Sequence, residues 1–204
     1  ASTSTAQVVR QSGYPCGRAV ETTDRLAADG LTQTVTATNE SAEPAPFGTG
    51  PHPYLVAGAA ALDEWTFTLP ADRVLEVTDD QLAPIALADV AGSARFDWRA
   101  QRVLGDVEID HAFTGLSRVD GLATVQIVDP SGTGVEMVWD AACPWVQIHT
   151  ADLPLLPDGG VDPGHLAGLA VEPMTCAPDA FNAHRYDYDA GLLVIAPGSS
   201  ASAS

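Results

Sequence analysis

The stretch at residues 123–139, ATVQIVDPSGTGVEMVW, decides the fold class of this chain. Apolar residues occupy every second position in its two halves, at Ala123, Val125, Ile127, Val135, Met137 and Trp139. A period of two is typical of a β-strand with one buried face. The turn-forming segment DPSGTG separates the two halves, so the stretch predicts an antiparallel hairpin with a longer loop.

The same alternation recurs on both sides of this hairpin. The further alternating positions are Leu31, Val35 and Ala37, with Gln33 as an exception, then Trp65, Phe67 and Leu69, then Val146 and Ile148. Residues 192–196 form a short apolar run of the buried-strand kind. Helical spacing is weak: residues 79–90 show some of it, but Pro84 interrupts the pattern. We therefore predict an all-β fold, an antiparallel β-sandwich.

Charge and composition exclude several classes of function. The chain has 204 residues, 27 acidic against 9 basic, a net charge of -18, and no lysine. Such an acidic field repels phosphate backbones, which argues against nucleic-acid binding. The absence of lysine excludes Schiff-base chemistry and a phosphate-binding P-loop. No apolar run is long enough to cross a bilayer, so we expect no membrane partner.

The organisation of the chain is simple. Residues 1–198 show no internal repeat and no linker, so we predict one domain there. Residues 199–204, SSASAS, are small and polar, and we expect a disordered tail. Residues 153–164 are rich in Pro, Gly and Asp and predict a long surface loop. Three widely spaced cysteines provide neither a disulfide framework nor a zinc motif, and a reduced cytoplasm is the simplest location.

Three segments carry residues suited to chemistry: PFGTGPHPY at 46–54, EIDHAF at 108–113 and LAVEPMTCAPDAFN at 169–182. Taken alone, His52 between two prolines is more often a surface turn residue, and Asp110 with His111 is more often a strand-end or exposed pair. Glu172 differs, because it follows an apolar run and precedes a proline. A carboxylate beside a strand core is costly unless it is paired or faces a cleft.

Local motifs for other chemistries are missing. The five histidines, His52, His111, His149, His165 and His184, lie far apart and form no metal-binding spacing. The alternative is a metal site assembled from residues that lie far apart in the sequence. The G-x-S-x-G motif of serine hydrolases does not occur. Cys176, between two nearby prolines, is better explained by packing than by nucleophilic catalysis.

Taken together, in this order and at this spacing, the three segments resemble the aldose 1-epimerase (galactose mutarotase) family. PFGTGPHPYL resembles the family's glycine-rich stretch that leads to a histidine and an aromatic residue. EIDHAFTGL resembles its Asp-His-x-Phe segment, and GLAVEPMTCAPDAFN resembles its glutamate segment. The resemblance runs from about residue 13 to residue 198 and implies a β-sandwich of the galactose mutarotase type.

The resemblance also implies an activity, the interconversion of the α and β anomers of a free aldohexose such as galactose or glucose. Ring opening needs a base for the anomeric hydroxyl and an acid for the ring oxygen, and it needs no cofactor or metal. On the family's pattern Glu172 is the base, His52 is the acid, and Asp110 holds sugar hydroxyls.

The chain departs from the family's pattern in several places. Roughly the first third of the usual chain, which supplies another histidine and an arginine to the sugar site, has no counterpart here. The usual last strand is replaced by SSASAS, and Asp24 and His149 stand where aromatic residues are common. We therefore expect this chain alone to be a poor mutarotase and marginally stable. Two alternatives are a sugar-binding relative without turnover and a hexose-phosphate mutarotase, and the acidic charge argues against the second.

Overall fold

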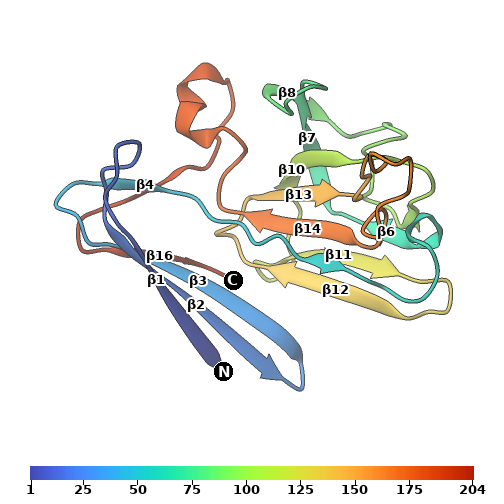
Figure 1. Cartoon of the computed structure of the whole chain (residues 1–204), viewed down its shortest axis with the longest axis horizontal. Coiled ribbons are helices and arrows are strands. Elements are labelled where there is room, and N and C mark those ends of the chain that lie inside the picture. The colour runs from blue at the N-terminus through green and yellow to red at the C-terminus, as the bar shows by residue number, and fades with distance from the viewer.

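The computed structural model describes residues 1–204, and its strands pair in an antiparallel manner throughout (Figure 1). The largest sheet has the order β5 (Tyr54–Leu55), β14 (Leu169–Met174), β13 (Trp145–His149), β10 (Asp110–Leu116), β7 (Ala71–Val77) and β8 (Pro84–Asp89). A second sheet has the order β12 (Gly134–Trp139), β11 (Ala123–Val128), β6 (Thr66–Thr68) and β9 (Arg102–Val103). Two short 3-10 helices are present, η1 (Leu62–Glu64) and η2 (Ala180–Arg185). Neither of them has the length and apolar character that crossing a membrane would require.

The hairpin predicted at residues 123–139 is confirmed as the pair β11–β12. Val125 lies opposite Met137, and Ile127 lies opposite Val135. The turn is held by Asp129, whose carboxylate accepts hydrogen bonds from the backbone N–H groups of Ser131 (2.7 Å) and Ala60 (2.8 Å). A short side chain that satisfies backbone donors stabilises a tight reversal of the chain, as the turn-forming sequence predicted.

The predicted β-sandwich is also confirmed. The six-stranded sheet and the β12–β11–β6–β9 sheet lie one above the other in Figure 1. Their inward side chains form one buried cluster that includes Phe67, Val125, Phe113, Ile148 and Val171. Because side chains of a strand alternate between faces, the buried residues of β13 and β14 leave the other face of the six-stranded sheet available for polar groups.

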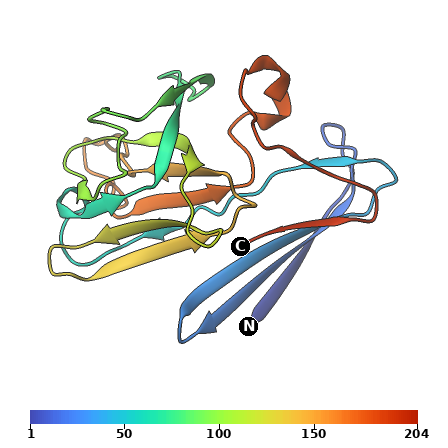
Figure 2. The ribbon, with the colours of Figure 1, turned by 180° about the vertical axis from the view of Figure 1, so that it is seen from behind.

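A third sheet extends away from the sandwich (Figures 1 and 2). It contains β1 (Ser2–Val8), β2 (Arg18–Ala27), β3 (Gly30–Asn39) and β16 (Ser200–Ala203). Beside it, β15 (Leu193–Ile195) pairs with β4 (Ala45–Phe47). Phe47 and Ile195 pack with Ala37 in a small separate core, which attaches this sheet to the β4–β15 pair.

Arg18 joins β2 to β4. The residue is only 6% exposed, and its guanidinium lies 4.5 Å from the ring centre of Tyr14 and 4.8 Å from that of Phe47. Arg18 Nη2 donates to the carbonyl oxygen of Pro46 at 2.5 Å, and the hydroxyl of Tyr14 donates to the same oxygen at 2.7 Å. Cation–π contacts of this kind are stronger where the charge is shielded from water. Pro46, at the start of the 46–54 segment, is therefore held by hydrogen bonds from both Arg18 and Tyr14.

Residues 79–90 form no helix. Their central part is β8, an edge strand that begins at Pro84. A proline lacks the N–H that a ladder needs, so the first residue of an edge strand is one of the few places in a sheet that accept it. Residues 153–164 form the predicted long loop, without a helix or a strand.

The prediction of a disordered tail at residues 199–204 is wrong. Ser200–Ala203 form β16, which pairs with β3. The hydroxyl groups of Ser202 and Thr36 share a hydrogen bond of 2.8 Å, and those of Ser200 and Thr38 share one of 2.7 Å. Ala203 reaches the main core. Strand pairing is made by the backbone, so small polar residues can extend a sheet when a neighbouring edge is free.

Deletion of residues 200–204 should therefore destabilise the protein. Each lost ladder hydrogen bond costs about 0.5–1.5 kcal/mol net, so a decrease on the order of 2 kcal/mol or more in the free energy of unfolding is expected by urea denaturation. The double variant Ser200→Ala/Ser202→Ala is the matched control, because it keeps the backbone pairs and loses only two hydroxyl contacts. Equal unfolding midpoints for the deletion and the intact chain would contradict the role of β16.

Candidate active site

Polar side chains from three adjacent strands meet on the outer face of the six-stranded sheet. Glu172 on β14 lies opposite Gln147 on β13, and His149 on β13 lies opposite Asp110 on β10. The neighbouring residues Val146, Ile148 and Val171 point the other way into the core. The register of two strand pairs thus brings together residues that are distant in the sequence.

His52 reaches the same face from the segment that runs beside β14. The N–H of Val171 donates to the carbonyl oxygen of Pro53 (3.3 Å), and the N–H of Thr175 donates to that of Thr49 (2.9 Å). The N–H of Thr49 donates in turn to Thr175 Oγ1 (2.9 Å). Prolines on both sides of His52 favour an extended backbone, so the segment lies along the strand without being part of it.

Two glycines allow this close approach. A Cβ on Gly48 would lie 2.4 Å from Cys176 Sγ. A Cβ on Gly50 would lie 2.9 Å from Met174 Cγ and 3.3 Å from the carbonyl oxygen of Pro173. The glycines of PFGTGPHPY therefore have a packing role, since any side chain there would push His52 away from Glu172.

His52 and Glu172 are in direct contact. The distance from His52 Nε2 to Glu172 Oε1 is 3.1 Å, with the His52 side chain 55% exposed and that of Glu172 13% exposed. The ring of Tyr54 lies beside His52, with ring centres 5.1 Å apart. An imidazole open to the surroundings and a mostly buried carboxylate thus share one edge of the site.

Burial raises the pKa of Glu172 above its usual value, and it is the largest influence on that group. The neighbouring imidazole of His52 acts in the opposite direction, Asp110 raises the pKa further, and His149 lowers it. Desolvation disfavours the charged form of a carboxyl group. Glu172 therefore takes up a proton more readily than an exposed glutamate does, which suits a general base.

Asp110 lies between two polar side chains of β13. Gln147 Nε2 donates to Asp110 Oδ1 at 2.6 Å. His149 Nδ1 lies 3.8 Å from Asp110 Oδ2, beyond hydrogen-bond distance. Gln147 Oε1 and His149 Nδ1 are buried and have no hydrogen-bond partner. A buried polar atom without a partner is costly, and a ligand is one way to satisfy such a group.

A cleft of about 420 Å³ adjoins Glu172, and His52, Asp110, Gln147 and His149 are not among the residues that line it. Glu172 lines it together with the 46–50 segment, Tyr14, Arg18 and residues from Met174 to Phe181. The apolar part of the same sheet face is covered by η2, where Ala180 packs with Trp145 and Leu75. In Figure 1, η2 stands above the end of β14. The face thus has a covered apolar part and an open polar part, and Glu172 lies where they meet.

The other candidate residues from the sequence have packing or loop-holding contacts. His111 follows Asp110 but points to the opposite face, where its ring centre lies 4.7 Å from that of Phe96. Burial lowers the pKa of His111. His165 Nδ1 accepts the N–H of Leu153 at 3.0 Å and fastens the long loop. Burial raises the pKa of the Cys176 thiol, as expected for a packed thiol and not for a nucleophile.

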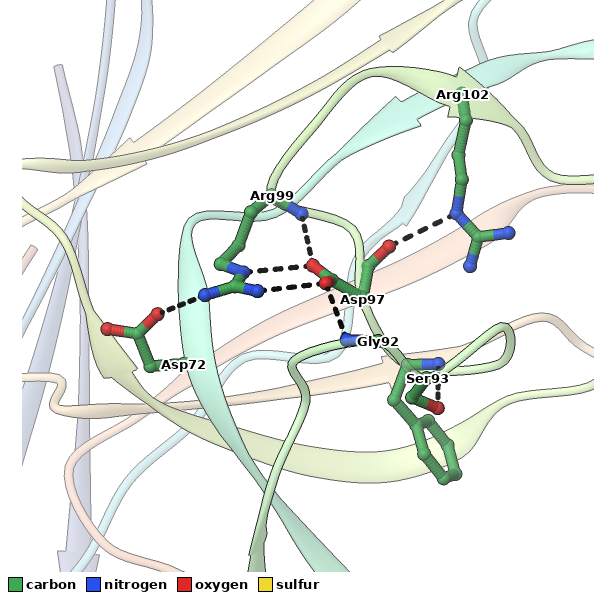
Figure 3. A network of polar contacts seen from close by, with 7 residues as sticks. Asp72, Gly92, Ser93, Asp97, Arg99 and Arg102 are labelled. Carbon is green, nitrogen blue, oxygen red and sulfur yellow. Dashed lines mark hydrogen bonds and ion pairs between the residues drawn. The ribbon is translucent and has the colours of Figure 1, made fainter.

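A wider hollow of about 680 Å³ lies elsewhere, lined by Gly92, Ser93, Ala94, Asp97, Arg99, Ala100 and Arg102. Figure 3 shows that its charged groups bind one another: Arg99 forms ion pairs with Asp97 (2.8 Å) and Asp72 (3.1 Å). The hydrogen bonds from Arg99 hold the pKa of Asp97 well below its usual range. The guanidinium of Arg102 lies 3.5 Å from the ring centre of Trp98. Arg102 also donates to the carbonyl oxygens of Asp97 and Ala94, so the charged side chains of this hollow hold a loop in place.

Sequence reasoning missed Gln147. The alternation of Val146 and Ile148 with Gln147 and His149 already indicated that both polar residues share a face. That pattern does not show which strands pair with the strand that carries Gln147 and His149. Only the pairing with β10 and β14 shows that this face is the one that carries Asp110 and Glu172.

The family model described as Aldose 1-epimerase matches residues 3–202, so the chain belongs to the aldose 1-epimerase family. Its fold is that of galactose mutarotase-like proteins. It is similar to a galactose mutarotase-like protein from Clostridium acetobutylicum (TM-score 0.78, 16% identity, 98% of this chain and 60% of that one). A GalM/aldose epimerase homologue from C. elegans has a TM-score of 0.76 and 18% identity, over 98% of this chain and 63% of that one.

Among curated proteins, the chain is similar to the uncharacterized protein YihR of Escherichia coli (strain K12). The two are 31% identical over 182 residues, which cover 88% of this chain and 54% of YihR. The chain thus spans about half the length of this relative and less than two thirds of each of the two solved structures.

The packing of the His52 segment leads to a test at Gly50. Gly50→Ala should destabilise the fold by roughly 1–3 kcal/mol, as overpacking does, and should separate His52 from Glu172. Thermal unfolding measures the first effect and the affinity for a sugar measures the second. Gly13→Ala is the control, since a Cβ there would meet nothing within 4 Å. Equal stability and equal sugar affinity of the two variants would show that neither property depends on the close approach of the segment to β14.

Proposed function

We propose that this chain interconverts the α and β anomers of a free aldohexose, such as galactose or glucose, by acid–base opening of the sugar ring. The observation that carries the proposal is the contact of 3.1 Å between His52 Nε2 and Glu172 Oε1 at the edge of a cleft. An imidazole and a carboxylate with a raised pKa are the two groups that the reaction needs. Membership of the aldose 1-epimerase family supports the same conclusion.

In the proposed mechanism, Glu172 removes the proton from the anomeric hydroxyl while His52 protonates the ring oxygen. The bond between the anomeric carbon and the ring oxygen breaks, and the open-chain aldehyde forms. Rotation about the first carbon–carbon bond presents the other face of the aldehyde. In closure, His52 takes back the proton of the attacking hydroxyl and Glu172 returns its proton to the aldehyde oxygen. Both residues then regain their starting states.

Asp110 and Gln147 are proposed to hold the sugar. Asp110 is partly exposed and can accept charge-assisted hydrogen bonds from hydroxyl groups. Gln147 Oε1 is buried and has no partner in the protein, and it can accept another hydrogen bond once its side chain turns toward the sugar. Since Gln147 Nε2 donates to Asp110 Oδ1, the two acceptors are fixed relative to each other. Such preorganisation favours one orientation of the sugar ring.

A hexose phosphate fits this site less well. The charged residues that line the cleft are Arg18, Glu172 and Asp179, and the guanidinium of Arg18 is already held between two rings. Arg18 is the one arginine among the residues that line the cleft, and the chain carries a net charge of -18. A dianionic phosphate would be repelled there. The uncharged anomeric centre of a free sugar meets no such penalty.

Polarimetry tests the proposal directly. With freshly dissolved α-D-galactose or α-D-glucose, the chain should accelerate the change in optical rotation. Glu172→Gln keeps the shape of the side chain but cannot accept the anomeric proton, so kcat should fall by about a hundredfold to ten-thousandfold while sugar affinity changes little.

The control for this substitution is Glu108→Gln, which makes the same change at an exposed residue. It should leave the rate unchanged. A Glu172→Gln chain that loses affinity and keeps its turnover number would identify Glu172 as a binding residue. An intact chain that binds these sugars without accelerating mutarotation would favour the sugar-binding alternative.

The pH dependence follows from the raised pKa of Glu172. The base must be ionised, and a carboxyl with a raised pKa becomes protonated at a higher pH than an ordinary glutamate. The rate constant kcat/KM should therefore fall as the pH decreases through a value above 4.5, the ordinary value for glutamate. A pH–rate profile measures this limb. Full activity down to the ordinary glutamate range would show that Glu172 is not the titrating base.

A further inference from the structure

His149 is a polar residue of the site face that the proposed chemistry does not use. Its side chain is 19% exposed, and its Nδ1 is buried without a hydrogen-bond partner. Since Nδ1 is buried, the exposed part of the ring lies on the side of Nε2, which makes no hydrogen bond within the protein. A polar atom in that position is available to a ligand.

The surroundings of His149 decide which nitrogen carries the proton. Asp110 Oδ2 lies 3.8 Å from Nδ1, so a small rotation of either side chain closes an Nδ1–H to carboxylate hydrogen bond. A carboxylate facing one imidazole nitrogen favours the tautomer with the proton on that nitrogen. Nε2 then carries a lone pair and acts as an acceptor. Asp110 itself is held in place by the hydrogen bond from Gln147 Nε2 at 2.6 Å.

The position of His149 relative to the acid–base pair suggests what it binds. The ring of Tyr54 neighbours both imidazoles, with its centre 5.1 Å from that of His52 and 6.4 Å from that of His149. A pyranose with its anomeric end at His52 and Glu172 would direct another of its hydroxyl groups across Tyr54 toward His149.

The group that His149 recognises should be a neutral hydrogen-bond donor. The ionisable groups that face it are Asp110 from β10, Tyr54 from β5 and, farther along the same face, Glu172 from β14. The imidazole of His52 lies on the same face, next to Glu172, and is paired with that carboxylate. A lone pair at His149 Nε2 accepts a hydrogen bond and repels an anionic group. A sugar hydroxyl is uncharged and can donate to Nε2 without that repulsion.

We propose that His149, oriented by Asp110, determines specificity by accepting a hydrogen bond at Nε2 from one hydroxyl of the aldose bound beside Glu172. The identity of the ligand as an aldose rests on the proposed function. The interaction distinguishes a sugar with a donor at that ring position from its epimer or deoxy analogue. Loss of one such bond should weaken binding by about tenfold.

Nitrogen NMR of the intact chain with labelled histidine tests this inference, with D-galactose and D-glucose as probes. His149→Phe assigns the resonances of His149, and His52→Phe assigns those of His52. We expect the Nδ1–H tautomer at His149 without sugar, and a shift of its Nε2 resonance when either sugar is added. Asp110→Asn should reverse the tautomer, because the amide can donate to Nδ1, and should weaken binding of the same sugar.

Deoxy analogues of the sugar that binds identify the hydroxyl. For the intact chain, one analogue should bind about tenfold more weakly than the parent sugar, whereas His149→Phe should bind both equally. His184→Phe makes the same substitution at an exposed residue of η2 and should match the intact chain. A sugar that shifts His52 but leaves His149 Nε2 unchanged would overturn this inference alone. A failure of both sugars to shift His52 would overturn the proposed function together with it.

Discussion

The pairing of β14 with β13 is the constraint on which the site depends. One register places Glu172 opposite Gln147 and, by the same alternation, sends Val171 and Ile148 into the core. A slip of one residue would exchange the two sets and bury the carboxylate in the apolar cluster. The burial of the core residues therefore fixes the position of the polar ones. The β13–β10 pair extends this arrangement to Asp110.

Glu172 and the 46–54 segment depend on each other. Gly48 and Gly50 let the backbone of this segment lie against β14, and His52 then gives the partly desolvated carboxylate an imidazole partner. A carboxyl group with little exposure and no partner would be costly in the folded state. The contact with His52 offsets part of that cost, while the remaining burial still raises the pKa of Glu172. The same geometry thus serves the stability of the strand end and the proposed base.

The sequence was informative where a pattern is local. Alternation predicted the hairpin at residues 123–139 and the sandwich. Burial of one strand face places apolar residues at every second position, and this spacing is visible in consecutive residues. The resemblance to a family singled out His52, Asp110 and Glu172, and the structure brings His52 next to Glu172 with Asp110 two strands away. The neighbourhood of Gln147 and His149 depends on pairing between distant strands, which no local pattern encodes. The strand at residues 200–203 was missed because its pairing relies on backbone groups and not on apolar side chains.

Arg18, which fastens β2 to the 46–54 segment, affects how the structure responds to ionic strength. Arg18 has no carboxylate partner, and its contacts are with a carbonyl oxygen and two aromatic rings in a buried place. Mobile ions screen exposed pairs such as Arg25 with Asp29 far more than buried contacts of this kind. Added electrolyte also relieves the mutual repulsion of the 27 acidic residues. The contacts that fasten the start of the 46–54 segment are therefore little affected by ionic strength, even though the surface of the chain is strongly acidic.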